Sequence, residues 1–171
     1  MRPASSLMDQ TNWTSCDLYD AHEGALRVFL PGLNSYGGLT RFSGEVKTAR
    51  CFGDNSVVKA TLASEGRGRV LVVDGGGSLH HALMGDLIAQ SAIDHGWAGV
   101  IIEGCVRDTK VLGEMQLGVL ALGAIPRKSV RRGEGEVDVE IGIRGVVLRS
   151  GDHIYVDEDG AIVSEKPLLG E

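Results

Sequence analysis

Arg107 and Asp108 stand almost directly after the apolar run GVII, which is typical of a buried strand. In α/β folds, ligands bind in the loops beyond the carboxyl ends of the strands. An arginine in such a loop can hold a carboxylate or a developing enolate, and an aspartate can hold a hydrated divalent ion. A solvated ion pair on an ordinary loop is the alternative that these two residues leave open.

The sequence GDLI, at residues 85–88, is a second candidate for binding chemistry. Backbone N–H groups at the start of a helix have no partner within the helix, and a glycine leaves them accessible to an anion. A substrate carboxylate fits such a position, although a simple helix cap formed by Asp86 explains the same residues. Because this segment and Arg107 both follow apolar strands, we expect them to line one cleft.

Three other patterns support only weak hypotheses. The sequence DGGGS departs from the dinucleotide-binding pattern, because the required third glycine is His80 and no phosphate-loop lysine follows. His80 and His81 are adjacent, so on a helix they point in different directions and do not form a zinc site. Covalent catalysis through a Schiff base is disfavoured, because it needs a buried lysine with a lowered pKa. The five lysines all stand in polar contexts: Lys47, Lys59, Lys110, Lys128 and Lys166.

Hydrophobic periodicity and turn residues predict a mixed α/β chain whose last third is rich in strands. Ser78 and Asp86 are the expected N-caps of two helices, and the basic cluster at residues 127–132 is expected to be a solvated loop. The expected elements are buried strands at 68–74, 97–104 and 117–125, an alternating strand at 137–143, hairpin strands over 145–164, and helices at 54–66, 78–84 and 85–96.

Composition is typical of a soluble globular protein. The 171 residues carry 17 basic and 23 acidic side chains, a net charge of −6. Direct nucleic-acid binding is disfavoured, because phosphate contacts need a basic surface. No signal peptide or membrane-spanning stretch is recognisable, so we expect a cytoplasmic protein without membrane contact. We also expect one domain over residues 1–171, with residues 1–12 flexible.

Several longer segments together resemble the RraA-like family, and the resemblance covers nearly the whole chain. This family groups regulators of ribonuclease E activity with 4-hydroxy-4-methyl-2-oxoglutarate aldolases. It implies a swivelling β/β/α fold, with a mixed sheet core and a β-rich C-terminal segment, and a homotrimer with clefts between subunits. The segments are VLVVDGGGSLHHALMGDLIAQSA, GVIIEGCVRD, LGVLALGAIPRKS and GVVLRSGDHIYVDEDGAIV.

The resemblance also implies a metal-dependent class II aldolase that releases pyruvate from 4-hydroxy-4-methyl-2-oxoglutarate and decarboxylates oxaloacetate. Asp108 is expected to hold the divalent metal, Mg²⁺ or alternatively Mn²⁺, and Asp86 to hold a water that relays a proton. The residues implied to bind the small 2-keto acid substrate are Arg107 and the backbone amides of Gly85, Asp86, Leu87 and Ile88.

The chemistry is consistent with these residue types. Cleavage of the C–C bond leaves a pyruvate enolate, and positive charge from the metal and from Arg107 stabilises it as it forms. The alternative function is a non-catalytic regulator that inhibits ribonuclease E, with the acidic surface meeting basic segments of that enzyme. Because a pure regulator has no need of a metal, Asp108 is the residue that separates the two hypotheses.

Overall fold

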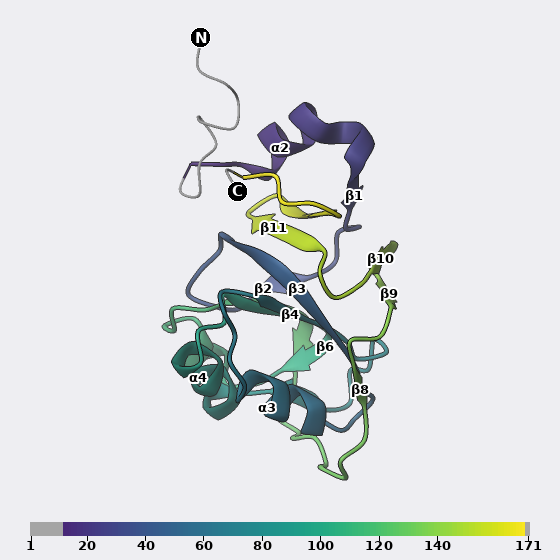
Figure 1. The fold of residues 1–171 in the computed structure, drawn as a ribbon. Helices are drawn as coiled ribbons and strands as arrows, with labels where there is room; N and C mark the ends of the chain where they lie inside the picture. Colours follow the sequence, from purple (N-terminus) through teal and green to yellow (C-terminus); the bar gives the residue numbers. More distant parts are fainter. Residues whose placement is uncertain (1–11, 170–171) are drawn as a thin grey trace.

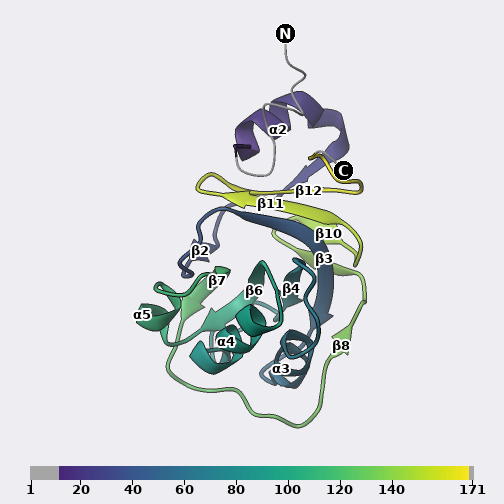
Figure 2. The same ribbon diagram turned by 60° about the vertical axis from the view of Figure 1, so that its left-hand side comes forward.

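Strand β3 (Phe42–Arg50) joins two β layers in the computed structural model, which describes residues 12–169 (Figures 1 and 2). Its first residues, 42–45, pair antiparallel with β11 (His153–Asp157). Its remaining residues, 46–50, pair in parallel with β4 (Val70–Asp74). One continuous strand therefore passes from a C-terminal antiparallel layer into a parallel layer, and it holds the two layers together.

The remaining elements extend this sheet on both sides. The helices are α2 (Ser15–His22), α3 (Ser56–Leu62), α4 (Asp86–Asp94) and α5 (Thr109–Leu112), with a 3₁₀ turn at Glu23–Ala25. The other strands are β1 (Leu26–Val28), β2 (Asn34–Ser35), β5 (Ala82–Met84), β6 (Gly99–Val106), β7 (Gly118–Ala124), β8 (Glu136–Val137), β9 (Ile141–Ile143), β10 (Val146–Leu148) and β12 (Gly160–Ser164). Within residues 12–169, ten strands form one mixed sheet, and β9 with β10 form a separate hairpin.

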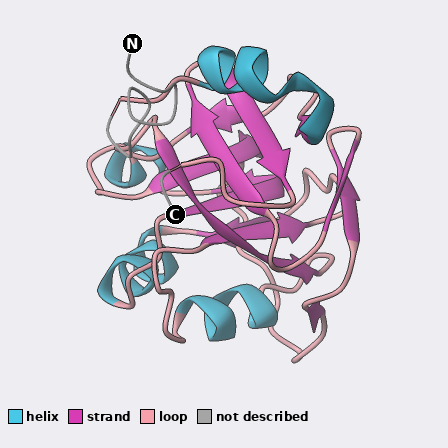
Figure 3. Cartoon of the chain, turned by 45° about the horizontal axis from the view of Figure 1, so that its top comes forward, coloured by secondary structure: helices cyan, strands magenta, loops and turns pink. Residues whose placement is uncertain are grey.

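These elements lie in four layers (Figures 2 and 3). Helix α2 covers the antiparallel strands β1, β12 and β11, and helices α3 and α4 cover the far face of the parallel strands β4, β6 and β7. Each of the three spaces between adjacent layers holds an apolar cluster. Trp13 belongs to the cluster under helix α2, Phe42 to the cluster between the two β layers, and Leu62 to the cluster between the parallel strands and helices α3 and α4. The expected mixed α/β fold with a β-rich C-terminal segment is confirmed.

The buried strands are located where the sequence predicts them. All eight residues of β6 are buried, and β6 pairs in parallel with both β4 and β7. A strand covered on both faces needs a continuous apolar run rather than an alternating one, which is what the sequence shows. The expected flexible segment at residues 1–12 lies outside the described residues apart from Asn12. No helix in the described part of the chain is long and apolar enough to span a membrane.

The helix expected at residues 78–84 is wrong. The chain passes through a turn and then forms strand β5, which pairs in parallel with the end of β6. All three residues of β5 are buried and apolar. As a strand beside β6 they extend the sheet, and their backbone groups find hydrogen-bond partners despite the burial. His80 and His81 consequently lie in a loop.

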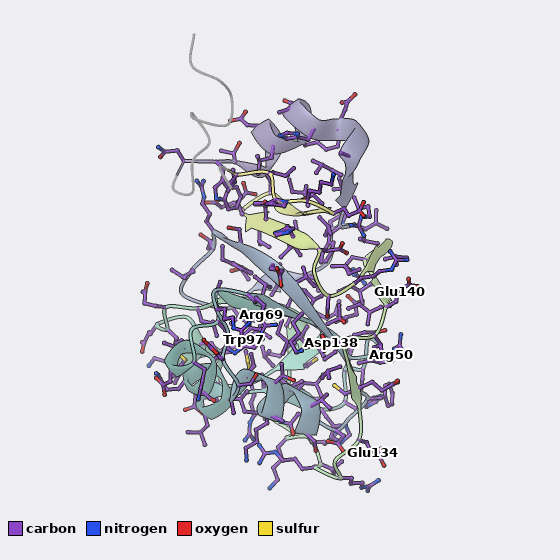
Figure 4. The ribbon with its side chains drawn as sticks, in the orientation of Figure 1. Arg50, Arg69, Trp97, Glu134, Asp138 and Glu140 are labelled. Atoms are coloured by element: carbon purple, nitrogen blue, oxygen red, sulfur yellow. The ribbon has the colours of Figure 1, made fainter. Side chains whose placement is uncertain are left out.

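The alternating segment at residues 137–143 is divided into β8 and β9 rather than forming one strand. Asp138 has a φ of 58°, in the left-handed region, so the extended conformation is interrupted there. Lys47 Nζ lies 2.9 Å from Asp138 Oδ2 and holds this corner against β3. Figure 4 shows Asp138 at this position, with Arg50 of β3 and Glu140 near it.

The ring of Phe42 packs against two facing glycines, Gly99 of β6 and Gly118 of β7. A Cβ atom on Gly118 would overlap Phe42 Cδ1, which requires the ring to move. We therefore expect Gly118→Ala to destabilise the protein by about 1–3 kcal/mol, as overpacking of a filled core does. Urea unfolding measures this change.

A matched control is Gly142→Ala, because Gly142 is exposed on β9 and a methyl group added there would meet no other segment within 4 Å. This control is expected to change the free energy of unfolding by less than about 0.5 kcal/mol. Equal stability of Gly118→Ala and wild type would contradict the close packing of Phe42 on the two strands.

Candidate active site

A cavity of about 490 Å³ lies beyond the carboxyl ends of β5 and β6. Its walls come from the start of helix α4, from the loop that follows β6, and from residues 128–131, with Asn55 contributing from the segment before α3. Loops beyond the carboxyl ends of parallel strands are the usual ligand sites of α/β folds. The structure thus brings residues 85–88, Arg107 and Asp108 to one cavity.

Helix α4 begins directly after β5, with Gly85 at its N-cap position. Asp86, the expected N-cap, is instead the first helical residue. A Cβ atom on Gly85 would lie 2.5 Å from Asp108 Oδ2 and 3.2 Å from Arg107 Cγ, so only glycine permits this approach. The N–H of Arg107 donates to the carbonyl oxygen of Met84 at 3.0 Å and fixes the two segments against each other.

Asp108 caps helix α4 from a different loop. Its Oδ2 accepts a hydrogen bond from the N–H of Asp86 at 3.0 Å, where the helix dipole also favours a negative charge. Asp108 has φ 59° and ψ 40°, a left-handed conformation that aspartate adopts more readily than most residues. Among residues 12–169, no group donates a hydrogen bond to its second oxygen, Oδ1. One carboxylate oxygen is therefore available to a cation.

The start of α4 and Arg107 together form an anion-binding wall. The N–H groups of Leu87 and Ile88 belong to the first helical turn, where no carbonyl of the helix accepts them. Leu87 is 83% exposed, and both residues line the cavity. Nη1 of Arg107 lies 3.4 Å from the carbonyl oxygen of Pro126, which is a weak contact that leaves the guanidinium available.

Residues 127–132 are exposed apart from Ser129, as expected of a solvated loop, but residues 128–131 also form a second wall of the cavity. The N–H of Ala82 donates to this segment, and the hydroxyl of buried Ser129 donates to the carbonyl oxygen of Ala82 at 2.6 Å. These bonds attach the segment to the edge of β5 and place Lys128 and Arg131 at the cavity. The local pattern RKSVRR predicts only exposure, since the contacts that fix it are more than forty residues away in sequence.

Asn55 connects strand β5 with the segment at residues 127–132 and was not identified from the sequence as a site residue. It is buried, and its Nδ2 donates to the carbonyl oxygen of Leu83 at 3.2 Å. Its Oδ1 accepts a hydrogen bond from Nε of Arg131 at 3.1 Å. The preceding Asp54 is also buried; burial raises the pKa of its carboxyl, but hydrogen bonds from Ser56 and from the 132–134 backbone outweigh burial and lower the pKa to about 2.

The carboxylates of the cavity suit a hydrated cation of the Mg²⁺ type. Asp86 and Asp108 are the acidic residues in its lining. Among the described residues, no three His, Cys, Asp or Glu side chains gather closely enough to hold a metal by themselves. Mg²⁺ keeps several waters and takes one or two carboxylates together with substrate oxygens, whereas structural zinc needs four protein ligands. Two carboxylates beside an anion-binding wall fit the first arrangement.

The capping role of Asp108 can be separated from its charge. Asp108→Asn retains an oxygen that accepts the Asp86 N–H, and asparagine tolerates the left-handed backbone. We therefore expect the free energy of unfolding of this variant to stay near that of wild type. Asp108→Ala loses the cap and is expected to be less stable by about 0.5–2 kcal/mol. Chemical denaturation of the three proteins checks this order; equal losses in the two variants would show that the hydrogen bond contributes nothing.

The family model described as RraA-like (Aldolase/RraA) matches residues 14–163. A relative from Alcanivorax borkumensis is 49% identical over 159 residues, which cover 92% of this chain and 99% of the relative. A relative from Aromatoleum aromaticum is 48% identical over 155 residues, covering 91% and 98% respectively. Both are provisionally named 4-hydroxy-4-methyl-2-oxoglutarate aldolase.

Two solved structures have the same fold at similar identity. The RNA-processing inhibitor RraA from Thermus thermophilis superposes with a TM-score of 0.89 at 44% identity, over 92% of this chain and 96% of that one. A protein from Geobacillus kaustophilus, named S-adenosylmethionine:2-dimethylmenaquinone methyltransferase, gives a TM-score of 0.91 at 43% identity, over 93% and 99%. The family match and these full-length similarities establish that this chain belongs to the RraA-like family.

Proposed function

We propose that this protein is a metal-dependent class II aldolase that cleaves 4-hydroxy-4-methyl-2-oxoglutarate into two molecules of pyruvate and also decarboxylates oxaloacetate. The names of the relatives support the reaction. The observation that carries the proposal is the contact of the α4 start with Arg107 and Asp108 at one cavity. This contact puts free amides, a guanidinium and an available carboxylate oxygen within reach of one small ligand.

The two walls of the cavity match the two ends of such a substrate. The first carboxylate and the neighbouring keto oxygen face the amides of Leu87 and Ile88 and the guanidinium of Arg107. The second carboxylate, at the far end of the substrate, meets Lys128 and Arg131, which line the same cavity. A molecule that is anionic at both ends therefore gains contacts from both walls, whereas pyruvate uses only one.

The protein groups have distinct tasks in the reaction. Breaking the bond between C3 and C4 leaves the electron pair on C3, and Arg107 stabilises the resulting enolate through a charge that is already in place. A divalent metal at Asp108, Mg²⁺ or Mn²⁺, supplies Lewis-acid charge at the keto and carboxylate oxygens when bound. Asp86, beside Asp108, holds the water that takes the proton of the C4 hydroxyl, whose oxygen becomes the keto oxygen of one pyruvate, and that returns a proton to C3 to release the other. Lys128 is exposed rather than enclosed among apolar groups, which disfavours a Schiff base.

A methyltransferase function, suggested by the name of the Geobacillus relative, has less support. The described cavity lining contains no aromatic residue to stack on an adenine ring. Three cationic side chains, Arg107, Lys128 and Arg131, suit small dianions instead. A homotrimer with the cavity near a subunit boundary is a part of the proposal that rests on the family resemblance; a cytoplasmic location is proposed as well.

Pyruvate release from 4-hydroxy-4-methyl-2-oxoglutarate and from oxaloacetate tests the proposal. We expect turnover with Mg²⁺ or Mn²⁺ and none with excess EDTA. Arg107→Met and Asp108→Asn are each expected to lower kcat by roughly 10²–10³, the usual effect of removing one group that stabilises a developing oxyanion. Lys59→Met, an exposed substitution on helix α3, is the control and should keep wild-type kcat. Turnover that persists in EDTA, or in Asp108→Asn, would refute the metal-dependent mechanism.

Regulation of ribonuclease E is the second candidate function. It is favoured by the 44% identity to the Thermus protein, which is named an RNA-processing inhibitor, and by the net charge of −6. An electrostatic complex is strongest at low salt and weakens as salt screens the charges. Binding to purified ribonuclease E is therefore expected at low ionic strength, with the affinity falling as salt is added. Absence of binding at low salt would exclude this candidate.

A further inference from the structure

Asp54 is a buried carboxylate that joins the start of helix α3 to the cavity wall; 1% of the residue is exposed. Its Oδ1 accepts hydrogen bonds from the N–H and the hydroxyl of Ser56, at 2.8 and 2.6 Å. Its Oδ2 accepts from the N–H groups of Arg132 and Glu134, at 2.7 and 3.2 Å. The two oxygens thus hold together two segments that are 78 to 80 residues apart in sequence.

These bonds fix the backbone on both sides of Arg131. On its C-terminal side, Arg132 is held by Asp54; on its N-terminal side, the carbonyl oxygen of Val130 accepts the N–H of Asn55 at 3.4 Å. The Arg131 side chain is bonded through Nε to Asn55, so its two terminal nitrogens are left for a ligand. Figure 4 shows Glu134, the last residue of the anchored segment, at the foot of the molecule near helix α3.

We propose that Asp54 is a positioning residue for the binding of the substrate's second carboxylate, and that it acts through Arg131. Asp54 itself is not among the residues that line the cavity. The inference rests on the proposed function, because it requires a substrate that is anionic at both ends. A residue behind the cavity wall would thus affect which substrate binds. Binding of pyruvate depends on the Arg107 wall alone, whereas binding of a dicarboxylate depends also on Asp54.

The chemistry of Asp54 predicts which substitutions preserve this role. Alanine removes every acceptor and releases the 132–134 backbone. Asparagine keeps its oxygen toward the N–H groups of Arg132 and Glu134 and its Nδ2 can donate to the Ser56 hydroxyl, so it loses only the acceptor of the Ser56 N–H and retains the anchor of the 132–134 backbone. Asp54→Asn is therefore expected to rescue most of what Asp54→Ala loses.

The test measures kcat and KM for oxaloacetate, and separately the exchange of pyruvate methyl protons with deuterated water by NMR. Asp54→Ala is expected to raise KM for oxaloacetate about tenfold, the order of one weakened charge-assisted hydrogen bond. Proton exchange at saturating pyruvate should stay at the wild-type rate. Because both substitutions act on the same contact, Asp54→Ala combined with Arg131→Ala should raise KM no further than Arg131→Ala alone.

Asp157→Ala is the matched control. Asp157 is also buried, and it accepts the N–H and hydroxyl of Ser15 together with the N–H of Asp159, but it anchors helix α2 on the far side of the sheet. This variant is expected to lose stability without a change in KM. If Asp54→Ala does not fold, Asp54→Ser keeps a helix-capping oxygen but does not span both segments, and it should give the same selective rise in KM.

Three results would overturn the proposal. Equal losses of pyruvate exchange and oxaloacetate turnover in Asp54→Ala would assign Asp54 a merely structural role. Additive effects of Asp54→Ala and Arg131→Ala on KM would show that Asp54 does not act through Arg131. A wild-type protein without turnover or exchange would refute the proposed function itself, and the role of Asp54 would fall with it.

Discussion

The hydrogen bond from the Asp86 N–H to the Asp108 carboxylate, which lies close against Gly85, sets the geometry of the site. It exists because Gly85 has no side chain and because β5 and β6 run side by side to the same edge of the sheet. The bond satisfies one of the N–H groups at the start of helix α4 that have no partner within the helix, and it leaves the next two, of Leu87 and Ile88, for a ligand. It also orients Asp108 so that one oxygen caps the helix and the other is available to a cation.

The charges around the cavity contrast with the acidity of the whole chain. Three cations, Arg107, Lys128 and Arg131, and two acids, Asp86 and Asp108, line it, which gives 3 − 2 = +1 in a protein of net charge −6. A local positive balance draws in small anions and stabilises the negative charge that develops on the keto oxygen as the enolate forms. The cations come from two different parts of the chain, and on the proposed function a ligand with a carboxylate at each end is expected to bind better than one with a single carboxylate.

The sequence predicts those parts of the fold and site that depend on local pattern. Continuous apolar runs locate β4, β6 and β7, and glycine followed by a helix start locates residues 85–88. Residues whose role depends on distant contacts were not predicted. Strand β5 is predicted as a helix because only its pairing with β6 makes the extended form favourable. The exposure of residues 127–132 is predicted correctly, but their place at the cavity is not, because it depends on the distant anchors Ala82 and Asp54. The same holds for Asn55 and Asp54, which from local pattern are only cap residues of a helix.

The cap formed by Asp108 and its proposed metal-binding role are separable, and calorimetric titration of Mn²⁺ separates them most directly. The titration is made in the presence of oxalate, a planar dianion that resembles the pyruvate enolate, with wild type and Asp108→Asn. We predict one Mn²⁺ site in the wild type and an affinity at least about tenfold weaker in Asp108→Asn, since the charged oxygen ligand is lost while the helix cap remains. Equal Mn²⁺ affinity in the two proteins would contradict a metal held by Asp108.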